Sequence, residues 1–263
     1  MYSDSGFSSP AEFSLPCRLL LTANAGIILE LDGRRLLIDA LHNTEHPHWS
    51  ALTPEMTESV FSFLEPAPPD AILCTHIHPD HYSAGLLERA AAAFPNAALI
   101  EPYRSGDASG EFRLSDALNI RWFSLPHMHT DAPFDPPNYG FLIEYRGKQI
   151  FTPGDADFST EEIHALFSRL SREAAGEPLP ETASVGHDRK GIDLALLNFP
   201  WITLKRGREA LALLSPKQLA LFHLPFADKD PLGYIPSTLH AAERFRPDAA
   251  VLCRFLQEVS FSL

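Results

Sequence analysis

The feature that most constrains this chain is a run of six residues that holds three histidines and an aspartate: His76, His78, Asp80 and His81. The run directly follows the apolar segment 71–74, which is typical of a buried strand. Residues two apart in an extended chain point the same way, so the first two histidines can bind one metal ion. We therefore expect a metal site at the carboxyl end of this strand.

Pro79 stiffens the turn after the histidine pair, and the segment 82–90 is typical of a helix. We expect Asp80 and His81 to lie near the first turn of that helix, where they can face a second ion. The alternative is a histidine-rich surface loop. Because chance rarely produces this spacing, we favour the metal site.

This His-x-His-x-Asp-His loop after a buried strand resembles the signature of the metallo-β-lactamase superfamily of metal-dependent hydrolases. The resemblance extends to residues 24–39, where an Asn-x-Gly turn precedes a strand that ends in Leu-Ile-Asp. It implies an α/β fold, a four-layer αββα sandwich, in a single domain over residues 1–263. It also implies three more ligands in chain order: a histidine, a bridging aspartate in a Gly-Asp step, and a late histidine after a strand.

The first of these ligands is expected after the strand-like segment 119–125, which leads to His127 and His129. We favour His129, because the superfamily's ligand commonly follows a strand, a proline and two spacer residues. His127 would then line the pocket behind the ligands. Which of the two histidines is the ligand stays open.

Two later positions complete the series. Asp155 follows a glycine after the strand-like segment 148–152, and glycine permits a tight backbone bend close to the metals. Asp157 competes for the same role. His223 follows an apolar run and matches the late histidine.

Carried over residue by residue, the resemblance implies two divalent ions. The first ion would be held by His76, His78 and His129. The second would be held by Asp80, His81 and His223, with Asp155 between the two. A hydroxide that bridges the ions would cleave a small ester, lactone or phosphoester, with Asp80 and Asp155 as catalytic carboxylates. Imidazole-rich sites suit zinc, and a set without thiolate also suits manganese or iron.

Three residues are candidates for binding the substrate: His42, His127 and Trp201. His42 closely follows the strand that ends in Asp39 and could line the substrate pocket, but we favour a solvated loop histidine at this position. Trp201 follows the strand-like segment 192–198, where it could contact an apolar part of the substrate or pack in the core. We expect Asp39 to be structural rather than a ligand.

Composition limits the classes of partner. The net charge is −13 and no basic cluster is visible, which argues against nucleic acid. The hydrophobic content of 45% suffices for a core, and no segment has the apolar length of a signal peptide or membrane span. The three cysteines show no disulfide or metal spacing. We expect a cytoplasmic enzyme that acts on a small-molecule substrate and does not contact membranes. It could form a homo-oligomer.

Within the superfamily, the first sheet and the chain length look most like the subgroup that includes a lactonase and the N-acyl-phosphatidylethanolamine phospholipase D. Two other classes of function stay open. A non-catalytic metal-binding sensor or partner module of the same fold is the main alternative. An RNA-processing nuclease is the third, and the acidic charge argues against it. We interpret segment 175–191 as a connection or lid.

The remaining pattern predicts the order of the elements. An Asp-Gly turn at 32–33 predicts a hairpin, and amphipathic spacing predicts a helix over 161–174. Helices are also expected over 54–64, 207–214 and 237–244, and the final strand over 249–252.

Overall fold

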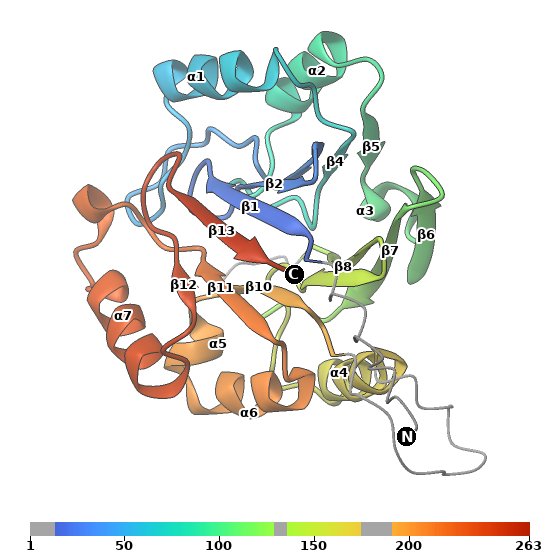
Figure 1. Ribbon diagram of the computed structural model, residues 1–263. Helices are drawn as coiled ribbons and strands as arrows, with labels where there is room; N and C mark the ends of the chain where they lie inside the picture. The colour runs from blue at the N-terminus through green and yellow to red at the C-terminus, as the bar shows by residue number, and fades with distance from the viewer. Residues whose placement is uncertain (1–13, 129–135, 175–190) are drawn as a thin grey trace, which may run out of the picture.

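The computed structural model describes residues 14–128, 136–174 and 191–263, in which two sheets pack face to face between two layers of helices (Figure 1). The first sheet has the order β13 (Glu258–Ser262), β1 (Pro16–Leu21), β2 (Ile27–Leu31), β3 (Arg34–Ile38), β4 (Ala71–Leu73) and β5 (Ala98–Ile100). The second has the order β12 (Ala250–Val251), β11 (Gln218–Phe222), β10 (Leu194–Asn198), β9 (Lys148–Thr152), β8 (Asn138–Tyr145), β7 (Leu118–Leu125) and β6 (Ser109–Arg113).

Helices cover the outer face of each sheet. The first sheet is covered by α1 (Pro54–Leu64) and α2 (Ala84–Ala93), at the top of Figure 1. The second is covered by α4 (Glu161–Ala174), α5 (Pro200–Thr203), α6 (Lys205–Leu214) and α7 (Tyr234–Phe245). Two short helices, α3 (Pro102–Ser105) and the 3-10 turn η1 (Ala227–Lys229), lie in connections. The predicted four-layer αββα sandwich is confirmed.

Alternation along each strand divides its side chains between two cores. In β11, Leu219 and Leu221 pack toward the helices, whereas Ala220 and Phe222 pack between the sheets. Burying one leucine side chain stabilises the fold by roughly 1.5–3 kcal/mol. In a strand that is buried on both faces every side chain lies in one of the two cores, so apolar residues are favoured at every position. This is why β10 reads Leu-Ala-Leu-Leu before its terminal Asn198.

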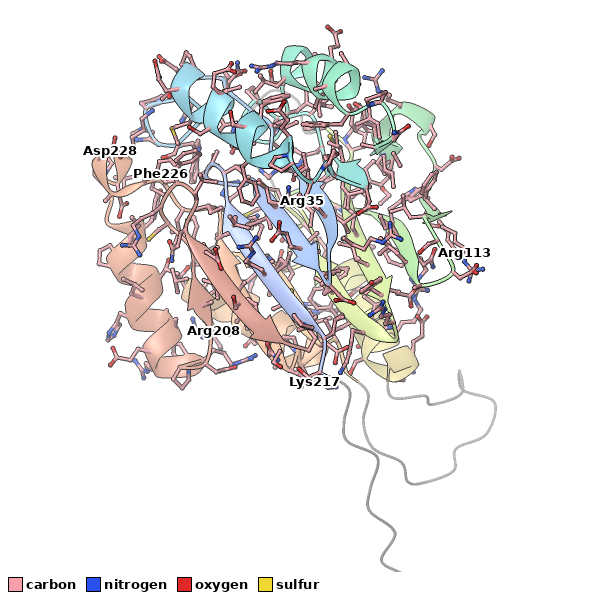
Figure 2. All side chains as sticks on the ribbon, turned by 45° about the horizontal axis from the view of Figure 1, so that its top comes forward. Arg35, Arg113, Arg208, Lys217, Phe226 and Asp228 are labelled. Carbon is pink, nitrogen blue, oxygen red and sulfur yellow. The ribbon has the colours of Figure 1, made fainter. Side chains whose placement is uncertain are left out.

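Strand direction brings the ends of many strands to one edge. Strands β9, β10 and β11 are mutually parallel, and β7 runs the same way because β8 is antiparallel to both β7 and β9. In the first sheet β3 and β4 are parallel. The two edges meet where the Tyr139 amide donates to the Thr75 carbonyl (3.0 Å). In Figure 2, Lys217, which precedes β11, lies at the lower end of the molecule, and Phe226, which follows β11, lies at the upper left.

Two expectations about the elements were wrong. Helix α2 begins at Ala84, after an extended Ser83, so Asp80 and His81 lie before the helix. They occupy a turn in which the amides of His81 and Tyr82 both donate to the His78 carbonyl (2.9 Å). The chain also continues past 252 into β13, which pairs with β1 and alternates between exposed and half-buried residues, as an edge strand does.

The boundaries of α1 and α4 match the expected ranges. Thr53 caps α1 by accepting from the Met56 amide (3.2 Å), and a proline begins the helix. Among the described residues, no helix combines the length and the apolar character needed to traverse a bilayer. Segment 175–190 of the expected lid lies outside the described residues.

Candidate metal centre

Asp39, at the end of β3, orients two of the candidate ligands. Its carboxylate accepts from the Thr75 amide (2.8 Å) and hydroxyl (2.6 Å), and from Nδ1 of His81 (2.9 Å). Since the Thr75 hydroxyl donates to Asp39, it accepts from Nδ1 of His76 (2.9 Å). Both imidazoles therefore carry their proton on Nδ1 and direct an Nε2 lone pair elsewhere. The expected structural role of Asp39 agrees with these contacts.

Nε2 of His76 is buried and has no hydrogen-bond partner among the described residues. The ring of His127 lies 4.8 Å from that of His76 and 4.7 Å from that of His78, measured between centroids. One ring nitrogen of each of the three lies within 4.8 Å of the others. Nδ1 of His127 donates to the Met128 carbonyl (2.6 Å), a contact that fixes the orientation of the ring.

The structure thus groups His127, expected as pocket wall, with His76 and His78. His127 pairs with Ala156 in an isolated antiparallel bridge, in the loop that follows β9. His129, the residue we favoured, lies outside the described residues. The first candidate ligand set is therefore a three-imidazole group.

A second group is formed by Asp80, His81 and His223, whose ligand atoms also lie within 4.8 Å of one another. Nε2 of His81 is 2.9 Å from Nε2 of His223, and Nε2 of His223 is 3.4 Å from Oδ2 of Asp80. His223 directly follows β11 and has φ +62°, a left-handed conformation that few non-glycine residues adopt. Asn24 supports the group by donating to Oδ2 of Asp80 (3.4 Å).

Asp155 lies between the two groups. Its Oδ2 is 3.4 Å from Nε2 of His81, 3.6 Å from Nε2 of His223 and 4.0 Å from Nε2 of His76. Its other carboxylate oxygen accepts from the Asn198 amide. Oδ2 therefore faces both candidate ligand groups, as expected of a bridging carboxylate.

The backbone at Asp155 requires the glycine that precedes it. Gly154 has φ +59°, and a Cβ there would meet Oδ1 of Asn138 at 2.4 Å and Cβ of Thr75 at 2.9 Å. That same Asn138 oxygen accepts from the Asp155 amide (3.0 Å). Glycine is required because both the left-handed conformation and the close approach exclude a side chain.

The carboxylates and the imidazoles of the second group shift each other's pKa. Burial disfavours the charged ring of His81, but Asp155 and Asp80 outweigh burial and raise its pKa above the ordinary range. The same opposition between burial and Asp155 raises the pKa of His223. Burial would raise the pKa of Asp155, but His223 and His81 lower it well below the usual value. The 2.9 Å contact between the two Nε2 atoms indicates that, without metal, the rings share a proton.

We expect opposite pH dependence for the metal-free and metal-loaded protein. The depressed pKa of Asp155 stabilises the fold above about pH 4, and this contribution is lost as pH falls. The raised pKa of His81 and His223 stabilises the metal-free fold below about pH 6.5, and this contribution is lost as pH rises through the folded-state pKa. The site thus supports the metal-free protein best between about pH 4 and 6.5.

Metal ligation needs the deprotonated imidazoles, so the gain in Tm on metal addition should be larger at pH 8 than at pH 5.5. Thermal unfolding after chelation and after metal addition, at both pH values, measures this gain. An equal gain at both values would contradict the expectation.

His42 is fully buried, and neither of its ring nitrogens has a hydrogen-bond partner among the described residues. Burial, with the charges of His81 and His223, lowers its pKa to about 3, although Asp80 opposes the shift. His42 is therefore a neutral imidazole close to the second ligand group, and the solvated loop histidine that we favoured from the sequence is wrong. Its contact with substrate remains a prediction.

We expect His42→Leu to leave the metal-free protein equally stable or about 1 kcal/mol more stable, because it removes two buried nitrogens that lack partners. Urea unfolding after chelation measures this, with the exposed His48→Leu as a control that should change little. A loss above about 1 kcal/mol would contradict the expectation.

Trp201 belongs to the core beneath the second sheet. It is fully buried, and its ring lies 5.3 Å from Phe158 and 5.4 Å from Phe167 between centroids. The alternative of core packing therefore describes it better than substrate contact does. Asn24, Asn138 and Asn198 are the supporting residues that sequence reasoning missed. Each lies in a turn or at a strand terminus beside the site, which is the pattern that could have indicated them.

The comparisons with known proteins point to one family. The sequence profile described as the Metallo-beta-lactamase superfamily matches residues 20–191. No curated protein matches the chain.

Solved structures of similar fold come from diverse sources. Igni18, a metallo hydrolase from the archaeon Ignicoccus hospitalis, has a TM-score of 0.60 and 17% identity, covering 94% of this chain and 99% of that one. An isothiocyanate hydrolase from Delia radicum gut bacteria has a TM-score of 0.56 and 14% identity, covering 94% and 100%. CmlA, a diiron β-hydroxylase from Streptomyces venezuelae, has a TM-score of 0.52 and 13% identity, covering 97% and 55%. At these identities the likeness shows a shared fold.

Proposed function

This chain belongs to the metallo-β-lactamase superfamily, and we propose that it is a metal-dependent hydrolase of a small ester, lactone or phosphoester. One observation carries the proposal. Two groups of candidate ligands, with Asp155 between them, converge at the edge where the strands of both sheets end. Such a cluster of titratable groups with shifted pKa values is typical of a functional site rather than a structural one.

The donor set fits divalent metal ions. His76 and His81 each direct an Nε2 lone pair away from a hydrogen-bonded Nδ1, and the 2.9 Å contact between His81 and His223 brings two nitrogens together. We propose two ions, the first held by His76, His78 and His127, the second by Asp80, His81 and His223, with Asp155 between them. Zinc is our first choice because imidazoles dominate, and manganese or iron are the alternatives. When bound, such ions lower the pKa of water and polarise the oxygen that the substrate presents.

The residues of the chain supply the geometry and the proton transfers. Asn198 and Asn138 hold the side chain and the amide of Asp155. The pKa of Asp80 is depressed, because His81 and His223 outweigh its burial, so Asp80 is ionised. We assign it, from its place beside the candidate ligands, the role of orienting the attacking water and taking its proton. The water oxygen then bonds to the substrate's carbonyl carbon or phosphorus. As the bond to the leaving group breaks, Asp80 returns the proton to the leaving oxygen.

The proposal is tested by offering a panel of substrates to zinc-loaded and manganese-loaded protein. The panel contains a carboxylic ester, a lactone, a thioester, a phosphomonoester and a phosphodiester. Asp155→Asn is the blank, and metal content is measured in the same samples. Turnover of an ester, lactone or phosphoester that vanishes in the variant supports the proposal and identifies the bond.

Silence across the panel, with two metal equivalents bound, would overturn the hydrolase proposal and favour a non-catalytic metal-binding module. The role of Asp80 has its own test. Asp80→Asn that keeps both metals and the full rate would contradict the assigned proton transfer.

A further inference from the structure

Three aromatic side chains lie beside the second ligand group: Trp49, Phe199 and Tyr234. The ring of Trp49 meets that of His223 edge to face, with 5.0 Å between centroids. Trp49 also stacks on Tyr234, with centroids 6.1 Å apart and planes within 6°. Tyr234 in turn contacts Phe199, at 4.9 Å. We call these three residues the aromatic wall.

The aromatic wall is attached to the candidate metal centre through neighbouring residues. Phe199 directly follows Asn198, which donates to Asp155. Trp49 directly precedes Ser50, whose carbonyl accepts from the Asn24 amide (3.1 Å), and Asn24 itself donates to Asp80. These contacts fix the wall relative to the candidate ligands.

The helix that carries Tyr234 is anchored as well. Asp230 accepts from the amides of Tyr234 (2.7 Å) and Ile235 (2.9 Å) at the start of α7. The Ser50 hydroxyl accepts from the Phe226 amide (2.7 Å), which joins the Trp49 segment to the chain after His223. Because both rings are held from their backbones, the wall is preorganised, and binding to it costs little ordering entropy.

The rings are not covered as core residues are. All three members of the wall are only half-buried, whereas Trp201 and Phe167 in the core are fully buried. The rings of Trp49 and Tyr234 are nearly parallel but offset, because their centroids are 6.1 Å apart. Partly exposed aromatic side chains next to a polar centre suit a ligand with one polar and one flat apolar end.

On these grounds we propose that the aromatic wall binds a flat apolar group, such as a phenyl ring, of the substrate whose polar group faces His223. The inference rests on the proposed function and specifies its substrate class. The 5.0 Å between the rings of Trp49 and His223 is about one ring width, so the apolar group lies within one or two bonds of the reacting group. Arylacetyl and benzyl esters or phosphoesters have this shape.

Equilibrium binding tests the wall without requiring turnover. Benzylphosphonate and methylphosphonate present the same anionic head to metal-loaded protein and differ by one phenyl group. We expect the wild type to bind benzylphosphonate about tenfold more tightly, the size of effect typical of aromatic contact with added apolar burial. Isothermal titration calorimetry measures both affinities.

The variants are Trp49→Leu, Tyr234→Leu and the conservative Trp49→Phe. We expect the two leucine variants to reduce the preference to about twofold or threefold, with methylphosphonate affinity unchanged, and Trp49→Phe to retain most of it. Phe245→Leu is the control, since Phe245 is an exposed aromatic at the far end of the same helix. Metal content and near-UV circular dichroism confirm that each variant is folded and loaded.

Absence of a benzyl preference in the wild type would overturn the inference. So would variants that weaken both probes equally, because that result places the rings in support of His223 rather than in contact with ligand. The two proposals fail separately. If no substrate of the panel is turned over but the wild type still prefers benzylphosphonate, the hydrolase proposal is overturned and the aromatic wall stands. If a substrate is turned over but the wild type shows no preference for benzylphosphonate, the hydrolase proposal stands and the aromatic wall is overturned.

Discussion

Asp155→Asn is expected to reduce hydrolysis by about 10³-fold or more, equivalent to roughly 4 kcal/mol of transition-state stabilisation. Oδ2 of Asp155 lies within 4.0 Å of ring nitrogens from both candidate ligand groups, so the amide removes the one negative charge that the two groups share. The variant should also bind fewer than two metal equivalents. Turnover and metal content by mass spectrometry measure both effects.

The matched control is Asp157→Asn, two residues further along the same loop. The Asp157 carboxylate accepts from the Ser159 amide (2.8 Å) and hydroxyl (2.7 Å), in a local turn before α4. It belongs to neither candidate ligand group of the described residues. We therefore expect full metal content and nearly full activity. Equal losses in the two variants would indicate damage to the loop rather than loss of a bridging ligand.

The strands that carry the candidate ligands were predictable, because in the sequence each candidate ligand follows shortly after an apolar, strand-like run. Each apolar run ends in a polar residue that cannot stay in the core, and parallel strands carry these residues to one edge. His76 after β4 and His223 after β11 follow this rule. Spacing therefore indicated the candidate ligands, and the family resemblance that they carry implied the sandwich that holds them.

Residues that act through a neighbour were harder to predict. Asn198 looks like the last residue of an apolar strand, and only the fold brings its amide to Asp155. The aromatic wall joins Trp49 to Tyr234, which are far apart in sequence and share no local pattern. The edge strand β13 was missed because it is short and half-exposed, so it lacks the apolar run that indicates a buried strand.

The choice between His127 and His129 shows a limit of spacing arguments. Both histidines follow β7 and lie two residues apart, so in an extended chain they would point the same way. A long-range feature accompanies the placement of His127, which pairs with Ala156 in an isolated bridge and lies beside His76 and His78, whereas His129 lies outside the described residues. Sequence has no local pattern for a bridge of this kind.

We expect His127→Ala to weaken binding at the first metal position by at least about 100-fold, because loss of a direct ligand should exceed the 10–100-fold effect of a residue that only supports one. The three-imidazole group would keep two rings, those of His76 and His78. The predicted result is a protein that retains one tightly bound ion and loses the other on dialysis. Metal content after dialysis against a weak chelator measures this.

His129→Ala is the matched comparison, since it removes the same side chain two residues away. If His127 is the ligand, His129→Ala retains two metal equivalents and most of the activity. If instead His129→Ala loses the ion and His127→Ala keeps it, the ligand is the residue that the superfamily pattern favoured, and His127 lines the pocket. Urea unfolding of both metal-free variants separates these outcomes from misfolding, because a ligand without its metal should contribute less than about 1 kcal/mol to stability.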